Sequence, residues 1–399
     1  MTIFYFDYKL VYHLEYHDKI FIKYINIIYG IWEMKGKYYD ITILWTWPAW
    51  LFCANKINEW KSILILEKSA SPAQKLLLSA KWRWNITNVN INPKKDYATD
   101  NPDFLKSAFD KFWVKNFLKF LDDEWIGIKE ENNGRILLKS WKVKEFHEKL
   151  LQLVKNKWIE IKYNSDFLDV KKMEDWNFEI KTSDWVYITK NFIVATWWPS
   201  FPKLWATAIA SDIANKFGLK TMPFYPALVW FETSQNFSSL SGSSVIWKLN
   251  LMKWDKIIYE EPWPILFTHR WISGPAVFNS SLFMRENLKE SKSKYKVRLF
   301  VSDKEITKRL LSFLWFRVNK LKEYTISSDV VNVRWLDEAK VCWWWVKTEN
   351  LNNNFECKDI PWLYFIGECI DVTWKTWWYN LQRCRTSGAV CAGGINKKN

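Results

Sequence analysis

The stretch from residue 41 to residue 68 constrains the fold of this chain more than any other, and it reads ITILWTWPAWLFCANKINEWKSILILEK. A short apolar strand leads directly into a helical segment, and a second apolar strand ends at Glu67. This order is typical of the first strand–turn–helix–strand unit of a dinucleotide-binding domain. Such a unit needs glycine in its turn, yet Trp45, Trp47 and Trp50 occupy those positions. Tryptophan disfavours positive φ, and three indoles would fill the space that a pyrophosphate needs.

The composition of the chain suggests why tryptophan stands there. The 399 residues include 30 Trp and only 11 Gly, whereas an average protein of this length has roughly 28 Gly. Tryptophans also occur in runs, such as 343–345, that cannot all face one core. A codon UGA that the organism reads as glycine, translated with a table that assigns UGA to tryptophan, would produce both anomalies. The alternative is a genuinely Trp-rich protein whose tryptophans form surfaces for aromatic stacking or for contact with a membrane interface.

Read with glycine, residues 45–50 become G-T-G-P-A-G, the dinucleotide fingerprint in its required context. In such a turn the first Gly permits the tight bend, the second admits the pyrophosphate, and the third lets helix and strand pack closely. Glu67, followed by Lys68, is placed to bind the adenosine ribose, and an acid there favours FAD or NAD over NADP. The predicted phosphate-binding residues are Trp45, Thr46, Trp47, Pro48, Ala49 and Trp50.

Periodicity gives a coarse map of the remaining chain. Apolar residues at three- and four-residue spacing predict helices over 102–122, 142–157 and 303–317. Short strands are expected between 158 and 195, and strand formers are frequent from about 220 to 300. A last helix is expected from about Asn380. Residues 1–33 lack the features of a signal peptide, and Met34 is the expected start of the protein.

Four further stretches become recognisable when glycine replaces tryptophan. They are KLLLSAKWRWNITN (75–88), ATWWPSFPKLWATAIA (195–210), FTHRWISGPAV (267–277) and WLYFIGECIDVTWKTWWYNLQ (362–382). Together with the turn, and in this order, they resemble the aminoacetone-oxidase-like, or bile-acid-reductase-like, NAD(P)/FAD-dependent oxidoreductases. The resemblance extends from about residue 39 to residue 394.

The resemblance implies an α/β fold and a cofactor. A Rossmann-like FAD-binding domain of the two-dinucleotide-binding flavoprotein type is built from both chain ends, here 39–215 and 339–399. A β-rich insert with a short helical segment, 216–338, lies between them, and 1–38 are an upstream extension. FAD is the implied cofactor, with NAD(P)H as a transient electron donor still open.

The resemblance also implies the residues that surround FAD. Besides the phosphate-binding turn and the ribose-binding acid, these are Lys81, Trp82 and Arg83 near the flavin-side phosphate and ribitol; Thr196, Trp197 and Trp198 at the second crossing of the flavin domain; Gly367, Glu368 and Asp371 at the pyrophosphate and ribityl chain; and Trp377, Trp378, Tyr379, Asn380 and Leu381 at the isoalloxazine. Two departures stand out: Trp84 replaces a usual Cys, and the helical part of the insert is short.

Candidates for proton transfer are few. His269 is a candidate because an imidazole can transfer protons near neutral pH, and Tyr379 is a candidate because it is expected beside the ring. A structural role is the commoner one for such residues. Arg83 and Arg270 could bind an anion or form salt bridges. Cys369 and Cys384 match no dithiol motif, and none of the six cysteines forms a CxxC pair. Four His are too few and too scattered for a metal site.

These observations predict a cytoplasmic FAD-dependent oxidoreductase that transfers a hydride between flavin and a small organic molecule. One alternative is a flavin-dependent RNA-modifying enzyme, although the net charge of +15 is scattered rather than clustered and argues against nucleic-acid binding. A second alternative, if the tryptophans are genuine, is a non-catalytic Trp-rich binding protein. No apolar run reaches membrane-spanning length. The substrate and the oligomeric state stay open.

Overall fold

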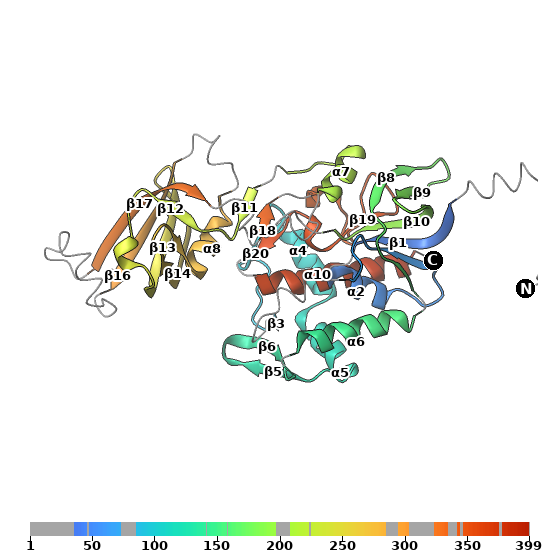
Figure 1. Cartoon of the computed structure of the whole chain (residues 1–399), viewed down its shortest axis with the longest axis horizontal. Coiled ribbons are helices and arrows are strands. Elements are labelled where there is room, and N and C mark those ends of the chain that lie inside the picture. Colours follow the sequence, from blue (N-terminus) through green and yellow to red (C-terminus); the bar gives the residue numbers. More distant parts are fainter. Residues whose placement is uncertain are drawn as a thin grey trace, which may run out of the picture.

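The structure, a computed structural model, describes residues 36–45, 48–72, 85–140, 142–157, 159–196, 208–222, 225–284, 294–302, 323–333, 341–343, 346–374 and 377–398. Two bodies of structure lie side by side along the long axis (Figure 1). One is a mixed α/β domain that contains both the first and the last elements of the described chain, and the other is a β-barrel inserted between them.

The α/β domain contains most of the helices. Its strands are β1 (Lys37–Leu44), β2 (Ile63–Leu66), β3 (Asn85–Asn88), β4 (Tyr97–Ala98), β5 (Ile128–Glu131), β6 (Arg135–Leu138), β7 (Glu160–Lys162), β8 (Phe167–Lys172), β9 (Phe178–Thr182), β10 (Val186–Val194), β19 (Leu363–Phe365) and β20 (Thr373–Trp374). Its helices are α2 (Pro48–Lys56), α4 (Pro102–Lys111), α5 (Val114–Asp123), α6 (Val143–Lys155), α7 (Ile209–Lys216) and α10 (Trp377–Asn396), with short 3-10 turns at Asn132–Gly134, Thr348–Asn350 and Gly367–Cys369.

A seven-stranded sheet organises this domain. Its order is β7-β2-β1-β10-β9-β8, and β19 also pairs with β10. Strands β7, β2, β1, β10 and β19 are parallel, whereas β8, β9 and β10 form an antiparallel meander. Every residue of β2 and β19 is buried, as expected for parallel strands covered on both faces. Strand β10 therefore belongs to both halves of the sheet.

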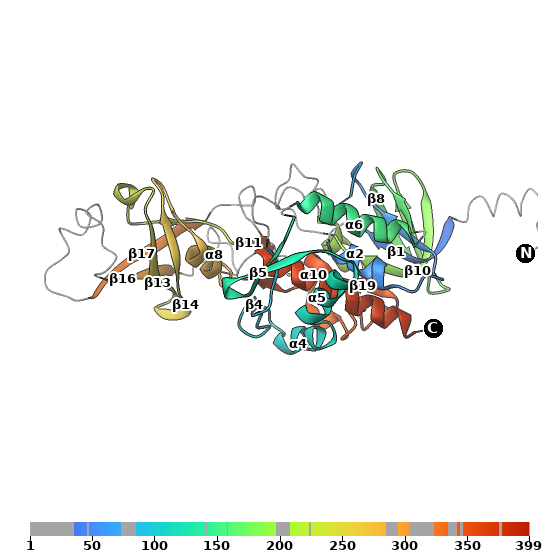
Figure 2. The same ribbon diagram turned by 90° about the horizontal axis from the view of Figure 1, so that it is seen from below.

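The C-terminal helix α10 packs closely on the first helix, α2 (Figures 1 and 2). The contact is close because Gly388 has no side chain: a Cβ there would lie 2.2 Å from the Ala49 carbonyl oxygen and 3.0 Å from the Cys53 nitrogen. The end of the chain thus completes the helical layer beside its first βαβ unit.

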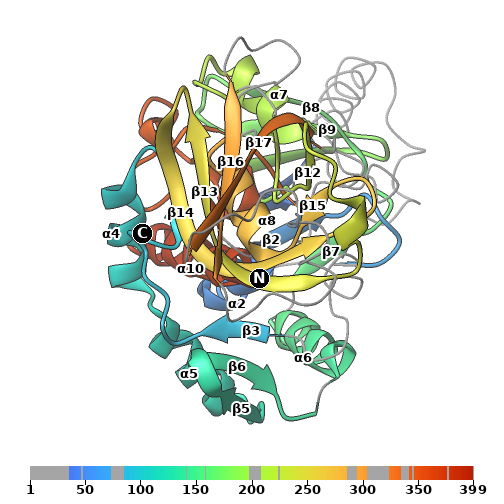
Figure 3. The same cartoon turned by 90° about the vertical axis from the view of Figure 1, so that its left-hand side faces the viewer.

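The insert is a closed barrel with strand order β12-β15-β14-β13-β16-β17. Its strands and helix, seen from the barrel side in Figure 3, are β12 (Phe231–Thr233), β13 (Ser244–Lys253), β14 (Lys256–Phe267), β15 (Ile272–Ser273), α8 (Pro275–Ser281), β16 (Tyr295–Ser302) and β17 (Glu323–Val333), with a 3-10 turn at Ser238–Leu240. Buried side chains, among them Trp247, Leu249 and Leu251 of β13, form a core separate from that of the α/β domain.

Two crossing segments join the bodies. Strand β11 (Tyr225–Ala227) leads into the barrel and pairs with β18 (Val341–Trp343), which leads out of it. A small apolar cluster spans the junction, with Ala98 of β4 against Leu228 and Leu282 of the barrel side. Because apolar contacts on both bodies are buried there, the junction holds the barrel against the α/β domain.

The expected fold class is confirmed: the chain has a Rossmann-like FAD-binding domain with a β-rich insert that includes a small barrel. Two predicted helix boundaries were wrong. The helix expected over 102–122 is two helices, because the backbone is extended at Phe112 and Trp113 and the Asn116 side chain accepts a bond from the Trp113 N–H at 2.8 Å. The last helix begins at Trp377 rather than near Asn380. The helix expected over 303–317 and the start expected at Met34 lie outside the described residues.

Candidate functional site

The candidate site lies where the parallel strands end. Strands β1, β2, β10 and β19 have their carboxyl ends at one edge of the sheet, and α2 begins at this edge. In open α/β sheets, ligands bind in the crevice outside the carboxyl ends of the strands, and the first helix presents its N-terminus to a phosphate. The topology therefore places the end of β1 and the start of α2, between which the predicted phosphate-binding turn lies in the sequence, at this edge.

Trp45 stands directly after β1 in a conformation that suits glycine. Its φ is +70° and its side chain is only 4 % exposed. Its backbone N–H donates to the Leu66 carbonyl at 2.8 Å, so the turn is fixed to β2. The indole Nε1 is buried without a hydrogen-bond partner. A bulky residue at positive φ with an unsatisfied buried donor is unfavourable on both counts.

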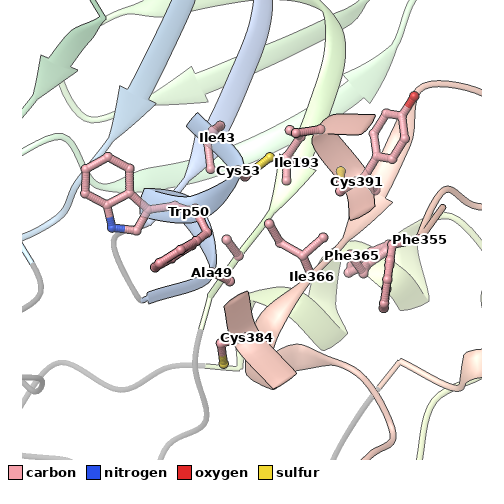
Figure 4. Close-up of a cluster of buried hydrophobic side chains, with 14 of the residues drawn as sticks. Ile43, Ala49, Trp50, Cys53, Ile193, Phe355, Phe365, Ile366, Cys384 and Cys391 are labelled. Carbon is pink, nitrogen blue, oxygen red and sulfur yellow. The ribbon is translucent and has the colours of Figure 1, made fainter. Parts of the chain in front are cut away.

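Ala49 and Trp50 lie on different sides of α2. Ala49 faces Ile366, whereas the Trp50 indole is directed away from it (Figure 4). Gly367 has φ +74°, and a Cβ there would lie 2.8 Å from the Ala49 Cβ. Trp50 is fully buried, and its Nε1 also lacks a partner. The backbone at the start of α2 is thus packed as closely as a nucleotide-binding turn requires. The side chains of Trp45, before the helix, and Trp50, within it, are nevertheless indoles.

Glu67 follows β2 and is buried at the same edge. Its Oε1 accepts the N–H of Ser69 at 2.7 Å and the Ser69 hydroxyl at 2.6 Å. These bonds hold the carboxylate at the end of the strand, where the sequence predicted ribose recognition. Lys68 instead forms an ion pair with Asp166 at 2.7 Å. Its charge is therefore partly neutralised by a neighbouring loop.

Several buried polar atoms at the end of β10 and on or beside α10 have no protein partner. Thr196 follows β10, Asn85 begins β3, Thr373 begins β20 and Asn380 lies in the first turn of α10. All four are buried, and the unpaired atoms are Thr196 Oγ1, both amide atoms of Asn85, Thr373 Oγ1 and Asn380 Nδ2. Buried polar groups are normally hydrogen-bonded. Such a set therefore fits a polar ligand such as FAD, although the indoles of Trp45 and Trp50 do not.

The other predicted residues of the last motif also lie in this region. Glu368, Asp371 and Leu381 are buried, and Gly367 opens the short turn after β19. Thr99 donates its hydroxyl to the Asp371 carbonyl oxygen at 3.0 Å, which connects the motif to the segment after β4. The structure thus brings the first and last predicted motifs together at one edge of the sheet.

Tyr379 is half-buried in the first turn of α10. Burial, and next the nearby carboxylates of Asp96 and Glu261, raise the pKa of Tyr379 to about 12, against the opposing charge of Arg135. The phenol consequently carries its proton throughout the neutral range. Glu261 belongs to the barrel, so the barrel approaches the predicted flavin end of the site.

The remaining catalytic candidates do not join this group. His269 and Arg270 are exposed in the turn after β14, and the His269 ring lies 6.0 Å from the Trp271 ring. Cys369 is buried, with its thiol donating to the Ile366 carbonyl at 3.1 Å, and burial raises its pKa to about 12. Cys384 is a buried free cysteine. A thiol with a raised pKa is a poor nucleophile.

Some predicted site residues lie outside the described residues, and they are Thr46, Trp47, Lys81, Trp82, Arg83, Trp197 and Trp198. Pro48, Trp377 and Trp378 are described only as parts of their helices. Sequence reasoning missed Asn85 and Thr373, although both stand inside recognised motifs. No sequence pattern marks them, because only their burial without partners in the folded chain distinguishes them.

The described helices include none whose length and hydropathy suit a bilayer crossing. Within the same residues, no group of three or more His, Cys, Asp or Glu side chains could hold a metal ion.

Comparisons with known proteins match nearly the whole chain. The family model described as the HI0933-like protein Rossmann domain matches residues 39–394. A ribosomal RNA dihydrouridine synthase of Haemophilus influenzae is 26% identical over 414 residues, covering 91% of this chain and 100% of the relative. The enzyme of the same name from Escherichia coli is 25% identical over 398 residues, covering 89% and 97%.

A solved structure agrees at the level of the fold. The 3-ketosteroid-Δ4-(5α)-dehydrogenase of Rhodococcus jostii, in complex with 4-androstene-3,17-dione, superposes with a TM-score of 0.52 at 9% identity. The match covers 91% of this chain and 97% of the dehydrogenase. At this identity the likeness shows a shared architecture and nothing about the substrate.

Proposed function

Because the chain belongs to the HI0933-like Rossmann-domain family, we propose that it is an FAD-dependent oxidoreductase that passes a hydride between the flavin and an organic substrate. The observation that carries this proposal is the edge of the parallel sheet. There α2 begins and Glu67 is held at the end of β2, while Thr196 after β10 and three residues on or beside α10 each have a buried polar side-chain atom without a protein partner. This arrangement suits a long, polar, two-ended cofactor.

Each part of the chain would hold a different part of FAD. Glu67 would accept hydrogen bonds from the adenosine ribose, and the first turn of α2 would face the pyrophosphate. Thr196, Asn85 and Asn380 would bind the flavin half. Bound FAD supplies the hydride chemistry, and the amino end of α10 would favour negative charge on the reduced ring. We further propose NAD(P)H as a transient donor that docks over the flavin.

We also propose that the native protein has glycine at many of the printed tryptophans. Ten non-glycine residues of the described chain have positive φ, and five of them are tryptophan: Trp45, Trp125, Trp176, Trp254 and Trp362. Tryptophan has no preference for this region, whereas glycine adopts it readily. A codon read as glycine by the organism accounts for this coincidence and would clear the indole of Trp45 from the site.

The test is a visible absorption spectrum of two purified proteins from synthetic genes. One carries tryptophan as printed, and the other carries glycine at all 30 tryptophan positions. The proposal expects flavin absorption only in the glycine protein. Flavin in both would refute the glycine argument, and a folded glycine protein without flavin would refute the cofactor.

A second substrate class is supported by one specific observation. Both curated relatives named ribosomal RNA dihydrouridine synthase align with this chain over nearly their whole length. We therefore propose, beside a small organic substrate, reduction of a uracil base in ribosomal RNA. This substrate also agrees with the cytoplasmic location expected from the sequence. Incubation of the flavin-loaded protein with NADPH and unmodified ribosomal RNA should form dihydrouridine. No dihydrouridine, together with binding that does not weaken as salt rises, would remove this candidate.

A further inference from the structure

One end of the barrel brings together lysines that are far apart in the sequence. Strands β14, β13 and β16 lie side by side in that order (Figure 3). At the end of β13, Lys253 is paired with Lys256 of β14 on one side and with Tyr295 of β16 on the other. Tyr295 is flanked in the chain by Lys294 and Lys296. The strand register therefore gathers four lysines, although β15 and α8 separate the two pairs along the chain.

The turn between β13 and β14 fixes the place of these lysines. Trp254 and Asp255 alone connect the two strands, and both have positive φ, +49° and +64°. Positive φ at both central residues is the backbone of a tight two-residue hairpin turn that matches the twist of its strands. The Trp254 N–H also donates to the Lys294 carbonyl oxygen at 3.2 Å. The lysines consequently project from a defined framework of paired strands.

The positive charge of this group is only partly compensated. The acids at the neighbouring register positions, Asp255 and Asp329, both lie against Lys296: Asp255 forms an ion pair with it at 3.5 Å, and Asp329 is opposite it on β17. Lys256 and Lys294 are exposed and form no ion pair within the described part of the chain. The cluster thus presents a local excess of positive charge to solvent.

This arrangement is unfavourable for the fold itself. Lys253 and Lys256 stand directly opposite one another on paired strands, and like charges in such positions destabilise a sheet. A bound polyanion would relieve the repulsion between them. Lysines that neutralise the phosphates of a nucleic acid release its condensed counterions, which favours binding. The geometry therefore suits a chain of phosphates better than it suits the isolated barrel.

We propose that the lysine cluster, formed by Lys253, Lys256, Lys294 and Lys296, binds the phosphate backbone of an RNA substrate. This inference rests on the second candidate function, reduction of a uracil base in ribosomal RNA. Phosphate contacts position a nucleic acid without reading its sequence. The barrel would accordingly hold the RNA, and the α/β domain would carry out the reaction on the base.

The experiment measures binding of the full chain to an unmodified ribosomal RNA fragment across a series of salt concentrations. The test variant combines Lys253→Gln, Lys256→Gln and Lys294→Gln. A matched control removes the same net charge from the α/β domain by substituting glutamine for three exposed lysines that each lie beside an acid, Lys119, Lys142 and Lys144. All of these changes lie outside the apolar cores, and the unfolding temperature checks that both variants keep the fold.

The test variant should bind the RNA at least about 10-fold more weakly than the control variant at about 0.1 M salt. The slope of log affinity against log salt should also become less steep by about 2, because each phosphate contact to a single strand contributes about 0.7. Equal affinity and equal slope in the test and control variants would overturn the cluster as the RNA contact.

Further outcomes separate this inference from the proposed function. If the wild-type protein forms dihydrouridine in the RNA and the test variant does so with unchanged KM, the candidate function stands and the cluster is refuted. If the wild-type protein binds no RNA but reduces a small organic substrate, the cluster and the RNA substrate are both refuted. Vesicles of phosphatidylserine and phosphatidylcholine in equal amounts supply the remaining comparison. Vesicle binding lost in the test variant, with RNA binding retained, would assign the cluster to a membrane surface and overturn the inference.

Discussion

At the scale of single residues, the backbone identifies which tryptophans are out of place. Trp125 follows α5 with φ +58°, and its N–H donates to the Asp122 carbonyl at 2.9 Å. This is the position after a helix that glycine usually occupies. The Trp125 side chain is 95 % exposed, so it has almost no packing to offset the strain. Trp247 is the opposite case, because it lies in the barrel core with its ring 5.7 Å from Phe267.

These two positions give a prediction with its own control. Trp125→Gly should stabilise the protein by about 1 kcal/mol, the usual cost of a left-handed non-glycine residue. Trp247→Gly should destabilise it by about 3 kcal/mol or more, since a large core side chain is lost. Denaturant unfolding of both variants measures the two changes. Destabilisation by Trp125→Gly would show that tryptophan is preferred at this left-handed position.

At the scale of elements, the close crossing of α2 and α10 depends on Gly388, which has no side chain. Gly388→Ala would place a Cβ 2.2 Å from the Ala49 carbonyl oxygen, a distance that forces the helices apart. We expect a loss of about 2 kcal/mol or more, in the range of overpacked cores. Gly393→Ala, on the same helix with nothing within 4 Å of its Cβ, should be neutral or stabilising by about 0.5 kcal/mol. Thermal unfolding compares the two, and equal midpoints would contradict the close-packing argument.

A second element-scale prediction concerns pH and the edge of the main sheet. Glu160 of β7 accepts bonds from Tyr39 at 2.5 Å and Lys37 at 2.7 Å, both on β1. Burial would raise the pKa of Glu160, but these bonds and Lys162 outweigh it and lower the pKa from 4.5 to about 2. A carboxyl whose pKa falls on folding stabilises the protein above its unfolded pKa. Its contribution should therefore disappear as the pH falls from about 4.5 to 2.

The comparison with Glu160→Gln measures this contribution. The wild-type protein should be the more stable of the two above about pH 5, and the difference should shrink toward pH 2. A difference that does not depend on pH would show that the bonds of Glu160 do not rely on its charge. The exposed pair of Lys119 and Asp123 on α5 serves as a control, because Asp123→Asn should have little effect at any pH.

At the scale of elements, some parts of the fold could be predicted from the sequence and others could not. The unit β1–α2–β2 was predicted because its pattern is local: two apolar strands, a turn and an acid at the second strand's end. Barrel closure was not predicted, because it depends on pairing between distant strands, such as Phe231 of β12 with Val333 of β17. The break at Phe112 and Trp113 was missed because apolar spacing continues through it. Asn85 and Thr373 were overlooked since only burial shows that their polar atoms lack partners.

At the scale of the whole molecule, the described residues form two apolar cores and a third, small cluster at the junction. Leu282 after α8 and Ala98 of β4 meet in that cluster. The barrel and the α/β domain can each retain their core if this contact is weakened, because the residues of the two main cores do not overlap. The junction should therefore be the least stable part of the assembly.

Leu282→Ala should weaken the junction. We expect protease cleavage in the crossing segments to accelerate and thermal unfolding by calorimetry to separate into two transitions. Ile246→Ala, on the exposed outside of the barrel, should preserve the wild-type profile. A single cooperative transition in both variants would indicate that the junction is not an independent unit.

Strand β10 pairs in parallel with β1 before the insert and with β19 after it. During synthesis, a nascent chain emerging from the ribosome therefore leaves the end of β10 beyond its pairing with β9 without its β19 partner until the whole barrel and the final segment have been translated. The barrel strands are complete earlier, so the barrel can fold while the sheet of the α/β domain still lacks strand β19. Helix α10 follows β19, and the edge that is proposed to hold FAD is consequently assembled last. Cofactor loading should then be a post-translational event, and a supply of flavin during translation should not change the yield of folded barrel.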